Sequence, residues 1–258
     1  MIAPERQARL RDLLGKQGIA SLEMLAAELG VSHSTVRRDL DALEGEGLVK
    51  RTHGGAMWVG DASTPPTGAR PYAFDQRLEY NVLAKQRIAR AAKSLVQPGQ
   101  TVLLDGGTTT FFLAMELATT QLQLVTNSLP IANLMLNNDS VELVLTGGLM
   151  YPRYGVLLGP TAETALDQIH TKTLFLSVAG LHNGELFNQN MLLVQAELKM
   201  MERAQEVVLL IDSGKFGQQA LVRLCGLDQI DVIVTDAEPP AADRKRISDA
   251  GCKLIIAA

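Results

Sequence analysis

Six neighbouring residues carry the polar groups with which proteins read DNA. Their side chains are short hydrogen-bonding groups followed by two guanidiniums, and a guanidinium can form paired hydrogen bonds with guanine or phosphate. The six are Ser32, His33, Ser34, Thr35, Arg37 and Arg38. Val36, Leu40 and Leu43 recur among and after them at helical spacing, which predicts a helix with one apolar face and one DNA-reading face. Alone, the same pattern is equally typical of an amphipathic surface helix.

The elements before this helix favour the DNA-reading interpretation. Residues 5–17 and 22–29 each place apolar side chains at helical spacing, and Gly30 permits a sharp turn before Ser32. Ser21 and Ser32 are favourable N-terminal residues for the second and third helices. Together, a bracing helix, a glycine turn and a DNA-reading helix predict a helix-turn-helix motif.

Two short β-like runs follow the reading helix. They cover residues 48–52 and 56–59 and flank His53-Gly54-Gly55, which predicts a small hairpin, or wing. Lys50, Arg51 and His53 would then face phosphate or a minor groove. We therefore predict a winged helix-turn-helix DNA-binding domain over residues 1–59.

The composition limits the other classes of function. The chain has 258 residues and a net charge of −4, so a DNA-binding surface has to be a local basic patch. No apolar run has the length of a membrane span, and the N-terminus lacks the apolar core of a signal peptide. Cys225, Cys252 and four scattered histidines form neither a disulfide framework nor metal-ligand spacing. We expect a cytoplasmic protein with two buried thiols, no metal, no cofactor and no membrane partner.

The segment 60–80 has the composition of a linker. Residues 60–68 are rich in glycine, proline, serine and threonine, which favours a connection between two domains. Arg77 follows it, just before the next helix, and its sequence context is also compatible with a solvent-exposed charge.

Residues 81–258 alternate between short apolar strands and amphipathic helices. Such alternation predicts a mainly parallel sheet with helices on both faces, in an α/β domain that binds the effector and oligomerises. The expected strands cover 101–104, 122–125, 141–145, 173–178, 207–211, 231–234 and 253–256. The expected helices cover 85–96, 109–117, 129–136, 161–169, 192–203 and 241–250.

Small and hydroxyl-bearing residues follow five of these strands. Ligands of parallel sheets bind where the strands end, and glycines, threonine hydroxyls and backbone N–H groups at helix starts suit a phosphate. The segments are 105–110, 126–128, 146–148, 212–217 and 235–236. One such segment is weak evidence because turns use the same residues, whereas five in one domain predict a pocket.

The N-terminal motif resembles the DNA-binding signature of DeoR-family bacterial transcriptional regulators. The resemblance rests on residues 34–40, Leu43-Glu44, Gly47 and residues 51–56. It implies that the six polar residues face DNA and that Arg51 and His53 lie in the wing. Asp39 would repel phosphate, so we expect it to pair with and orient one of the neighbouring arginines.

The rest of the chain, to about residue 236, resembles the sensor domain of the same family. That domain is similar in fold to ribose-5-phosphate isomerase, glucosamine-6-phosphate deaminase and coenzyme A transferases. The resemblance implies an effector pocket formed by Asp105, Gly107, Thr108, Thr109, Thr126, Asn127, Gly147, Gly148, Gly180 and Lys215. Arg77, Lys85 and Lys199 also match family positions, the two lysines at the rim of the pocket.

Some positions depart from the family pattern. Related sequences often have Asp-Gly at Ala179-Gly180, Glu at Gln195 and Ser-Lys at Gly214-Lys215. Two lost carboxylates would remove acceptors for sugar hydroxyls, which favours a more anionic or otherwise unusual ligand. His182, in the atypical segment 181–190, could contact that ligand, although a surface-loop histidine is the commoner outcome.

Three classes of function agree with these patterns. The first is a transcriptional regulator, more often a repressor, of a carbohydrate-metabolism operon. It would bind operator DNA as a dimer or tetramer and respond to a phosphorylated metabolite. The alternative is a sugar-phosphate isomerase or deaminase with a DNA-binding domain. That alternative needs a base beside the substrate, and only Asp105 is placed near the phosphate loop, so we do not expect an enzyme. The third class is a purely structural DNA-bridging protein, which would bind no small molecule.

Overall fold

A computed structural model describes residues 3–17, 19–45, 48–52, 55–58 and 74–257, and every structural statement below refers to them. The chain divides into two compact units, Met1–Ala69 and Arg70–Ala258. Each unit has a hydrophobic core of its own. No helix within the described ranges is long and apolar enough to span a membrane.

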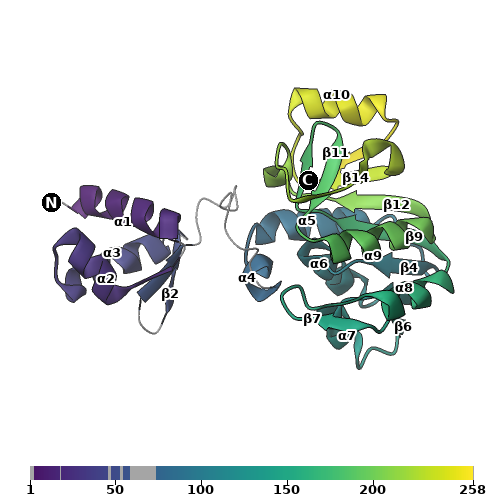
Figure 1. Ribbon diagram of the computed structural model, residues 1–258, viewed down its shortest axis with the longest axis horizontal. Coiled ribbons are helices and arrows are strands. Elements are labelled where there is room, and N and C mark those ends of the chain that lie inside the picture. Colours follow the sequence, from purple (N-terminus) through teal and green to yellow (C-terminus); the bar gives the residue numbers. More distant parts are fainter. Residues whose placement is uncertain (1–2, 18, 46–47, 53–54, 59–73, 258) are drawn as a thin grey trace. The chain divides into compact units, whose positions relative to one another are not determined.

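The first unit contains three helices and a small antiparallel sheet (Figure 1). The helices are α1 (Ala3–Gln17), α2 (Leu22–Leu29) and α3 (His33–Gly45). The strands are β1 (Ile19–Ser21), β2 (Val49–Thr52) and β3 (Gly55–Trp58), in the order β1-β3-β2. The helix-turn-helix and the β2–β3 hairpin confirm the predicted elements. β1 was not predicted, because three residues carry no periodicity.

Local hydrogen bonds explain where α2 and α3 begin. The Ser21 hydroxyl accepts from the Met24 backbone N–H at 3.2 Å, and the Ser32 hydroxyl accepts from that of Thr35 at 3.3 Å. Gly30 ends α2 with φ of +64°, a left-handed conformation that glycine adopts readily. The apolar faces of the three helices meet around the buried Leu10, Leu25 and Leu40.

The second unit is built on a seven-stranded sheet whose paired strands are all parallel. Its order is β15-β14-β12-β9-β4-β5-β6. The strands are β4 (Thr101–Leu104), β5 (Leu122–Thr126), β6 (Val141–Leu145), β9 (Thr171–Ser177), β12 (Ala204–Leu210), β14 (Val232–Thr235) and β15 (Lys253–Ile256). All seven were expected from their short apolar runs.

Helices cover both faces of this sheet (Figure 1). In β4, Val102 and Leu104 belong to one core and Leu103 to the other, as the alternation of side chains along a strand requires. The first core includes residues of α5 (Val82–Lys93), α6 (Thr108–Leu117) and α7 (Leu129–Met135). The second includes residues of α8 (Pro160–Asp167), α9 (Met191–Glu202) and α10 (Ala241–Asp249).

Several short elements were missed by the sequence patterns. His182 was more often expected in a surface loop, but it lies in the strand β10 (Gly180–His182). This strand pairs antiparallel with β11 (Glu185–Asn188), which β13 (Val222–Gly226) extends. A second antiparallel pair is β7 (Leu149–Tyr151) and β8 (Val156–Leu158). Two single-turn helices are η1 (Ser213–Lys215) and η2 (Leu227–Gln229).

The end of the predicted linker is ordered against the second unit. Phe74–Leu78 form the helix α4, and Phe74 meets Phe111 of α6 edge to face, with ring centroids 5.6 Å apart. The composition marked residues 60–80 as linker, but buried Phe74 anchors this last part to the α/β unit.

Candidate DNA-reading helix and anion site

The reading face of α3 is exposed. Ser32, His33, Ser34, Arg37 and Arg38 are exposed, and Thr35 is partly buried. The Ser32 hydroxyl lies 2.9 Å from those of both Ser34 and Thr35, so the three form one hydrogen-bonded group at the start of the helix. In the wing, the backbones of Lys50 and Arg51 lie in β2. Their side chains and the whole of His53 fall outside the described residues.

Asp39 does not pair with its neighbouring arginines, which corrects our expectation. Its side chain is buried and forms an ion pair with Arg6 of α1, in which Nη2 lies 3.1 Å from Oδ1. The reason is the helical period, because Asp39 lies three residues after Val36 and four before Leu43 on the core-facing side of α3. Asp39 therefore joins α3 to α1, and its charge is turned away from Arg37 and Arg38.

In the second unit, Asp105 fixes the loop between β4 and α6. Its Oδ1 accepts from the Gly107 backbone N–H at 2.9 Å and the Thr110 hydroxyl at 2.8 Å. Its Oδ2 accepts from the Ser177 backbone N–H at 2.8 Å. Burial raises the pKa of Asp105, while these hydrogen bonds oppose the rise. Because both oxygens accept hydrogen bonds from the protein, Asp105 is suited to shaping the loop rather than to acting as a base.

Some neighbouring loop residues hold the loop in place, whereas two others carry polar atoms without a hydrogen-bond partner among the described residues. A Cβ on Gly107 would lie 1.8 Å from the Ser177 hydroxyl oxygen, so any other residue there would force the Ser177 side chain to move. Thr126 donates to the Leu104 carbonyl at 2.8 Å and accepts from the Ser128 N–H at 3.0 Å. By contrast, the buried Thr109 Oγ1 and Asn127 Oδ1 have no hydrogen-bond partner among the described residues.

Arg77, which is partly buried, brings two buried guanidinium nitrogens to this region. It lies over the Tyr154 ring, with Cζ 4.5 Å from the centroid, and it interacts electrostatically with Asp105. Its Nε and Nη2 are buried without a hydrogen-bond partner among the described residues. Burial lowers the pKa of Arg77. Arg77 is therefore partly buried and not the solvent-exposed charge that its sequence context also allowed.

Lys85 lies close to Arg77, and Lys215 lies near Lys85 and Asp105. The ammonium of Lys85, on α5, donates to the Arg77 carbonyl. Burial, followed by repulsion from Lys215, lowers the pKa of Lys85 to about 7. Nζ of Lys215 lies 3.5 Å from Oδ2 of Asp212, which also interacts with Lys85. Arg77, Lys85 and Lys215, which we call the cation cluster, thus form a region suited to an anion.

The remaining predicted glycines have conformational roles. Gly147 and Gly148 follow β6 with φ of +72° and +117°. A Cβ on Gly180 would lie 2.2 Å from the Gln218 carbonyl oxygen, so that position permits close packing of two backbones. His182 lies in β10 rather than in a loop, with Nδ1 3.2 Å from the Gly217 carbonyl oxygen.

Two residues assigned near the pocket lie elsewhere. Lys199 pairs with Asp167 at 2.7 Å and Glu202 at 3.4 Å, across α8 and α9. Gln195 is exposed, so its difference from the family does not remove a carboxylate from the interior. Glu197, which our sequence analysis missed, is buried and interacts electrostatically with Asp105. The spacing of Leu193, Glu197 and Met200 on one helical face was the available signal.

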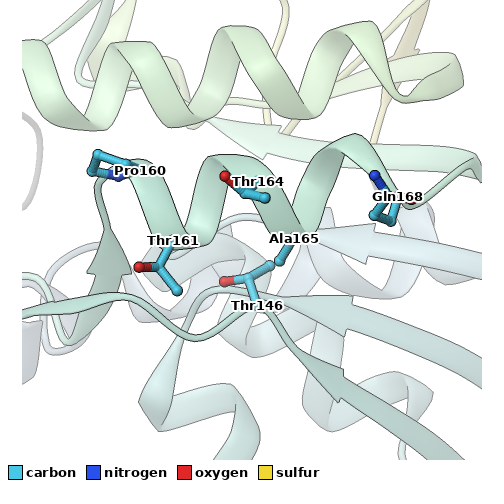
Figure 2. Close-up of a pocket in the computed structure, with 6 residues that line it drawn as sticks. All are labelled: Thr146, Pro160, Thr161, Thr164, Ala165 and Gln168. Atoms are coloured by element: carbon cyan, nitrogen blue, oxygen red, sulfur yellow. The ribbon is translucent and has the colours of Figure 1, made fainter.

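An open groove lies between α8 and the end of β6 (Figure 2). Figure 2 shows Thr146 facing α8 near Thr161 and Ala165. The groove is lined by Thr146, Pro160, Thr161, Thr164, Ala165 and Gln168, none of which is charged or belongs to the predicted effector set. The groove therefore offers no cation to an anionic ligand, unlike the cation cluster.

Comparisons with known proteins agree with both parts of the chain. Residues 6–60 match the DeoR-like helix-turn-helix domain, and residues 80–237 match the DeoR C terminal sensor domain. The HTH-type transcriptional regulator GlpR of Haloferax volcanii is 34% identical, over 99% of this chain and 98% of that protein. A putative aga operon transcriptional repressor of Escherichia coli O157:H7 is 33% identical, over 98% and 93%. The L-fucose operon activator of Haemophilus influenzae is 33% identical, over 88% and 89%.

Solved structures are more distant. Ribose 5-phosphate isomerase A from Methanocaldococcus jannaschii aligns with a TM-score of 0.40 and 19% identity, over 53% of this chain and 55% of that one. No activity follows from similarity at this level. The relatives that cover nearly the whole chain are named as transcriptional regulators. The chain belongs to the DeoR family of transcriptional regulators, with a DNA-binding helix-turn-helix domain followed by the family's sensor domain.

Proposed function

We propose that this regulator represses a carbohydrate-metabolism operon and that a phosphorylated sugar or related metabolite, bound at the cation cluster, weakens its hold on operator DNA. The observation that carries the proposal is the Arg77 guanidinium, whose Nε and Nη2 are buried and lack a hydrogen-bond partner among the described residues. Burying unpaired charge is costly, so such groups are retained chiefly where they act on a ligand. The curated relatives include proteins named for the aga and L-fucose operons, which supports a carbohydrate operon here.

The loop residues complete the proposed effector site. The backbone N–H groups at the start of α6, including those of Thr108 and Thr109, would bind a phosphate, with the hydroxyl of Thr109 as a further donor. Asn127 would contact the bound molecule through its unpartnered Oδ1. Asp105, Gly107 and Thr126 would hold these groups in place, as their hydrogen bonds and close packing indicate. The remaining members of the proposed site are Gly147, Gly148, Gly180 and Lys215.

We further propose that the α/β unit joins two or four copies of the chain in the cytoplasm. Val144 and Leu145 are exposed on β6, the edge strand of the parallel sheet, and Leu149 is exposed on the adjoining β7. Exposed apolar groups at a sheet edge favour contact with another chain. A two-fold oligomer would match two operator half-sites.

A thermal-shift panel on the full chain tests the effector proposal. It compares sugar phosphates and polyol phosphates with their unphosphorylated counterparts. A ligand at 100 times its Kd stabilises a protein by about 2.7 kcal/mol, which raises Tm by several degrees at roughly 2–4 °C per kcal/mol. We expect a shift with a phosphorylated compound and none with its unphosphorylated counterpart. Equal shifts for both members of every pair, or none at all, would contradict the cation cluster as a phosphate site.

A further inference from the structure

A buried carboxyl and a buried phenol adjoin the cation cluster and are not used by the anion site. Oε1 of Glu197 accepts from the Asn188 side-chain amide at 2.6 Å, whereas Oε2 is buried with no hydrogen-bond partner in the described part of the chain. The hydroxyl of Tyr154 is likewise buried and unpartnered there. Both residues are more than nine-tenths buried, at 6% and 5% relative exposure. Unpartnered buried polar groups need an explanation, and a ligand supplies one.

Packing places these two groups on the same side of α9. Leu193, Ala196 and Glu197 are three and four residues apart and so share a helical face. Tyr154 belongs to the same apolar cluster as Leu193 and Ala196. Tyr154 and Glu197 also interact electrostatically, and Tyr154 carries the Arg77 guanidinium over its ring. The carboxyl and the phenol therefore lie near each other, and the phenol contacts the Arg77 member of the cation cluster.

The charges of this region select the chemical group that fits there. Burial, and next the negative charge of Asp105, raise the pKa of Glu197 to about 8, so a neutral carboxyl dominates at pH 7. A ligand carboxylate would meet the nearby Asp105, and a ligand ammonium would meet Arg77. A hydroxyl is neutral and both donates and accepts, so it can satisfy Glu197 and Tyr154 together.

We infer that Glu197 and Tyr154 form a hydroxyl-recognising subsite beside the anion site, which makes them the residues that distinguish a phosphorylated polyol or sugar from an alkyl phosphate. The inference rests on the proposed anion site and adds the residues that read the rest of the ligand. It differs from the expectation of a more anionic ligand, which followed from the two carboxylates absent at Ala179 and Gln195.

Titration calorimetry with matched phosphate monoesters of three to six carbons tests this subsite. For each chain length, the full chain is titrated with the alkyl phosphate, the polyol phosphate and the aldonic acid phosphate. The alkyl ester reports the anion site alone. At the best-fitting length, we expect the polyol ester to bind about tenfold more tightly than the alkyl ester, as hydrogen bonds to buried groups allow. The aldonic acid ester, with its second anionic end, should bind more weakly than the polyol ester.

Variants identify the residues responsible for this hydroxyl preference. Glu197→Leu should reduce the preference to less than about twofold and leave alkyl phosphate affinity within about twofold. Tyr154→Phe should reduce the preference several-fold, and Glu197→Gln, which keeps a donor and an acceptor, should retain most of it. Glu202→Gln, an exposed position on the same helix, is the matched control.

The outcomes separate this inference from the proposed function. If alkyl phosphates bind but no polyol ester binds more tightly, the subsite is wrong and the anion site stands. A preference that survives in both Glu197→Leu and Tyr154→Phe would also overturn the subsite. If Glu197→Leu does not fold, the Tyr154→Phe and Glu197→Gln pair decides. Failure of every ester to bind would overturn the anion site and the subsite together.

Discussion

Replacing Arg37 and Arg38 together with alanine is expected to abolish specific operator binding while leaving effector binding intact. Each guanidinium that contacts a base in the major groove contributes about 1–3 kcal/mol of discrimination, so the double variant should lose roughly 30- to 20,000-fold in affinity. Both side chains are exposed on α3, and Asp39 pairs with Arg6 instead. The apolar face of α3 is untouched, so the fold should remain.

Fluorescence anisotropy on a duplex that the wild type selects from a random pool measures this loss. The matched control is Arg90→Ala with Arg244→Ala, which removes the same charge from exposed positions in the second unit. If the control weakened binding as much as the α3 variant, the effect would be one of net charge. Unchanged binding by the α3 variant would remove the assignment of α3 as the reading helix.

Replacing Lys85 with methionine is expected to stabilise the ligand-free protein and at the same time weaken its binding of phosphate esters. Lys85 is buried with a pKa lowered to about 7 from 10.5. Such a shift corresponds to a penalty of about 4 kcal/mol at pH 7, from which the lost hydrogen bond to the Arg77 carbonyl subtracts about 1 kcal/mol. We therefore expect a gain of about 2–4 kcal/mol in the free energy of unfolding. Loss of a charged contact should weaken the binding of phosphate esters by about tenfold or more.

The pH dependence of this gain follows from the direction of the pKa shift. The unfolded chain binds more protons at Lys85 than the folded chain between about pH 7 and pH 10.5. Wild-type stability should therefore rise relative to the variant as the pH increases through this window. The variant's advantage in the free energy of unfolding is largest below about pH 7 and shrinks as the pH approaches 10.5.

Urea unfolding at pH 7 and pH 9.5, with calorimetry at pH 7, checks both effects of the Lys85 substitution. Lys199→Met is the matched control, because Lys199 is paired at the surface, and it should change neither quantity appreciably. A destabilised Lys85→Met variant with normal phosphate affinity would show that Lys85 has a structural role instead.

The sequence was sufficient for the elements that repeat a period over several residues. Val36, Leu40 and Leu43 indicated the buried face of α3, and the apolar runs of the sheet indicated every parallel strand. Short antiparallel strands such as β7 and β10 were missed, since three residues are too few for a periodicity.

The candidate site was less accessible to sequence reasoning because its chemistry depends on distant residues. Asp39 shows this limit, since its pairing partner, Arg6, is 33 residues away in the chain. The motif around Asp105 could be recognised in the sequence. The hydrogen bond that the Ser177 backbone N–H, on a neighbouring strand, donates to the Asp105 carboxylate could not. Glu197 was overlooked because the family pattern differs at Gln195 instead. Only the packing of α9 shows that Glu197 is buried and Gln195 is exposed.

The central claim is that a small molecule bound by the sensor domain weakens operator binding. Its most direct test is an anisotropy titration of the full chain on the selected duplex, with and without a saturating amount of the compound that stabilises it in the thermal-shift panel. We predict that the compound weakens DNA binding by about 5- to 150-fold, the range of typical coupling free energies, and that Lys85→Met responds only weakly at the same concentration. DNA affinity that stays unchanged at saturation would contradict the account.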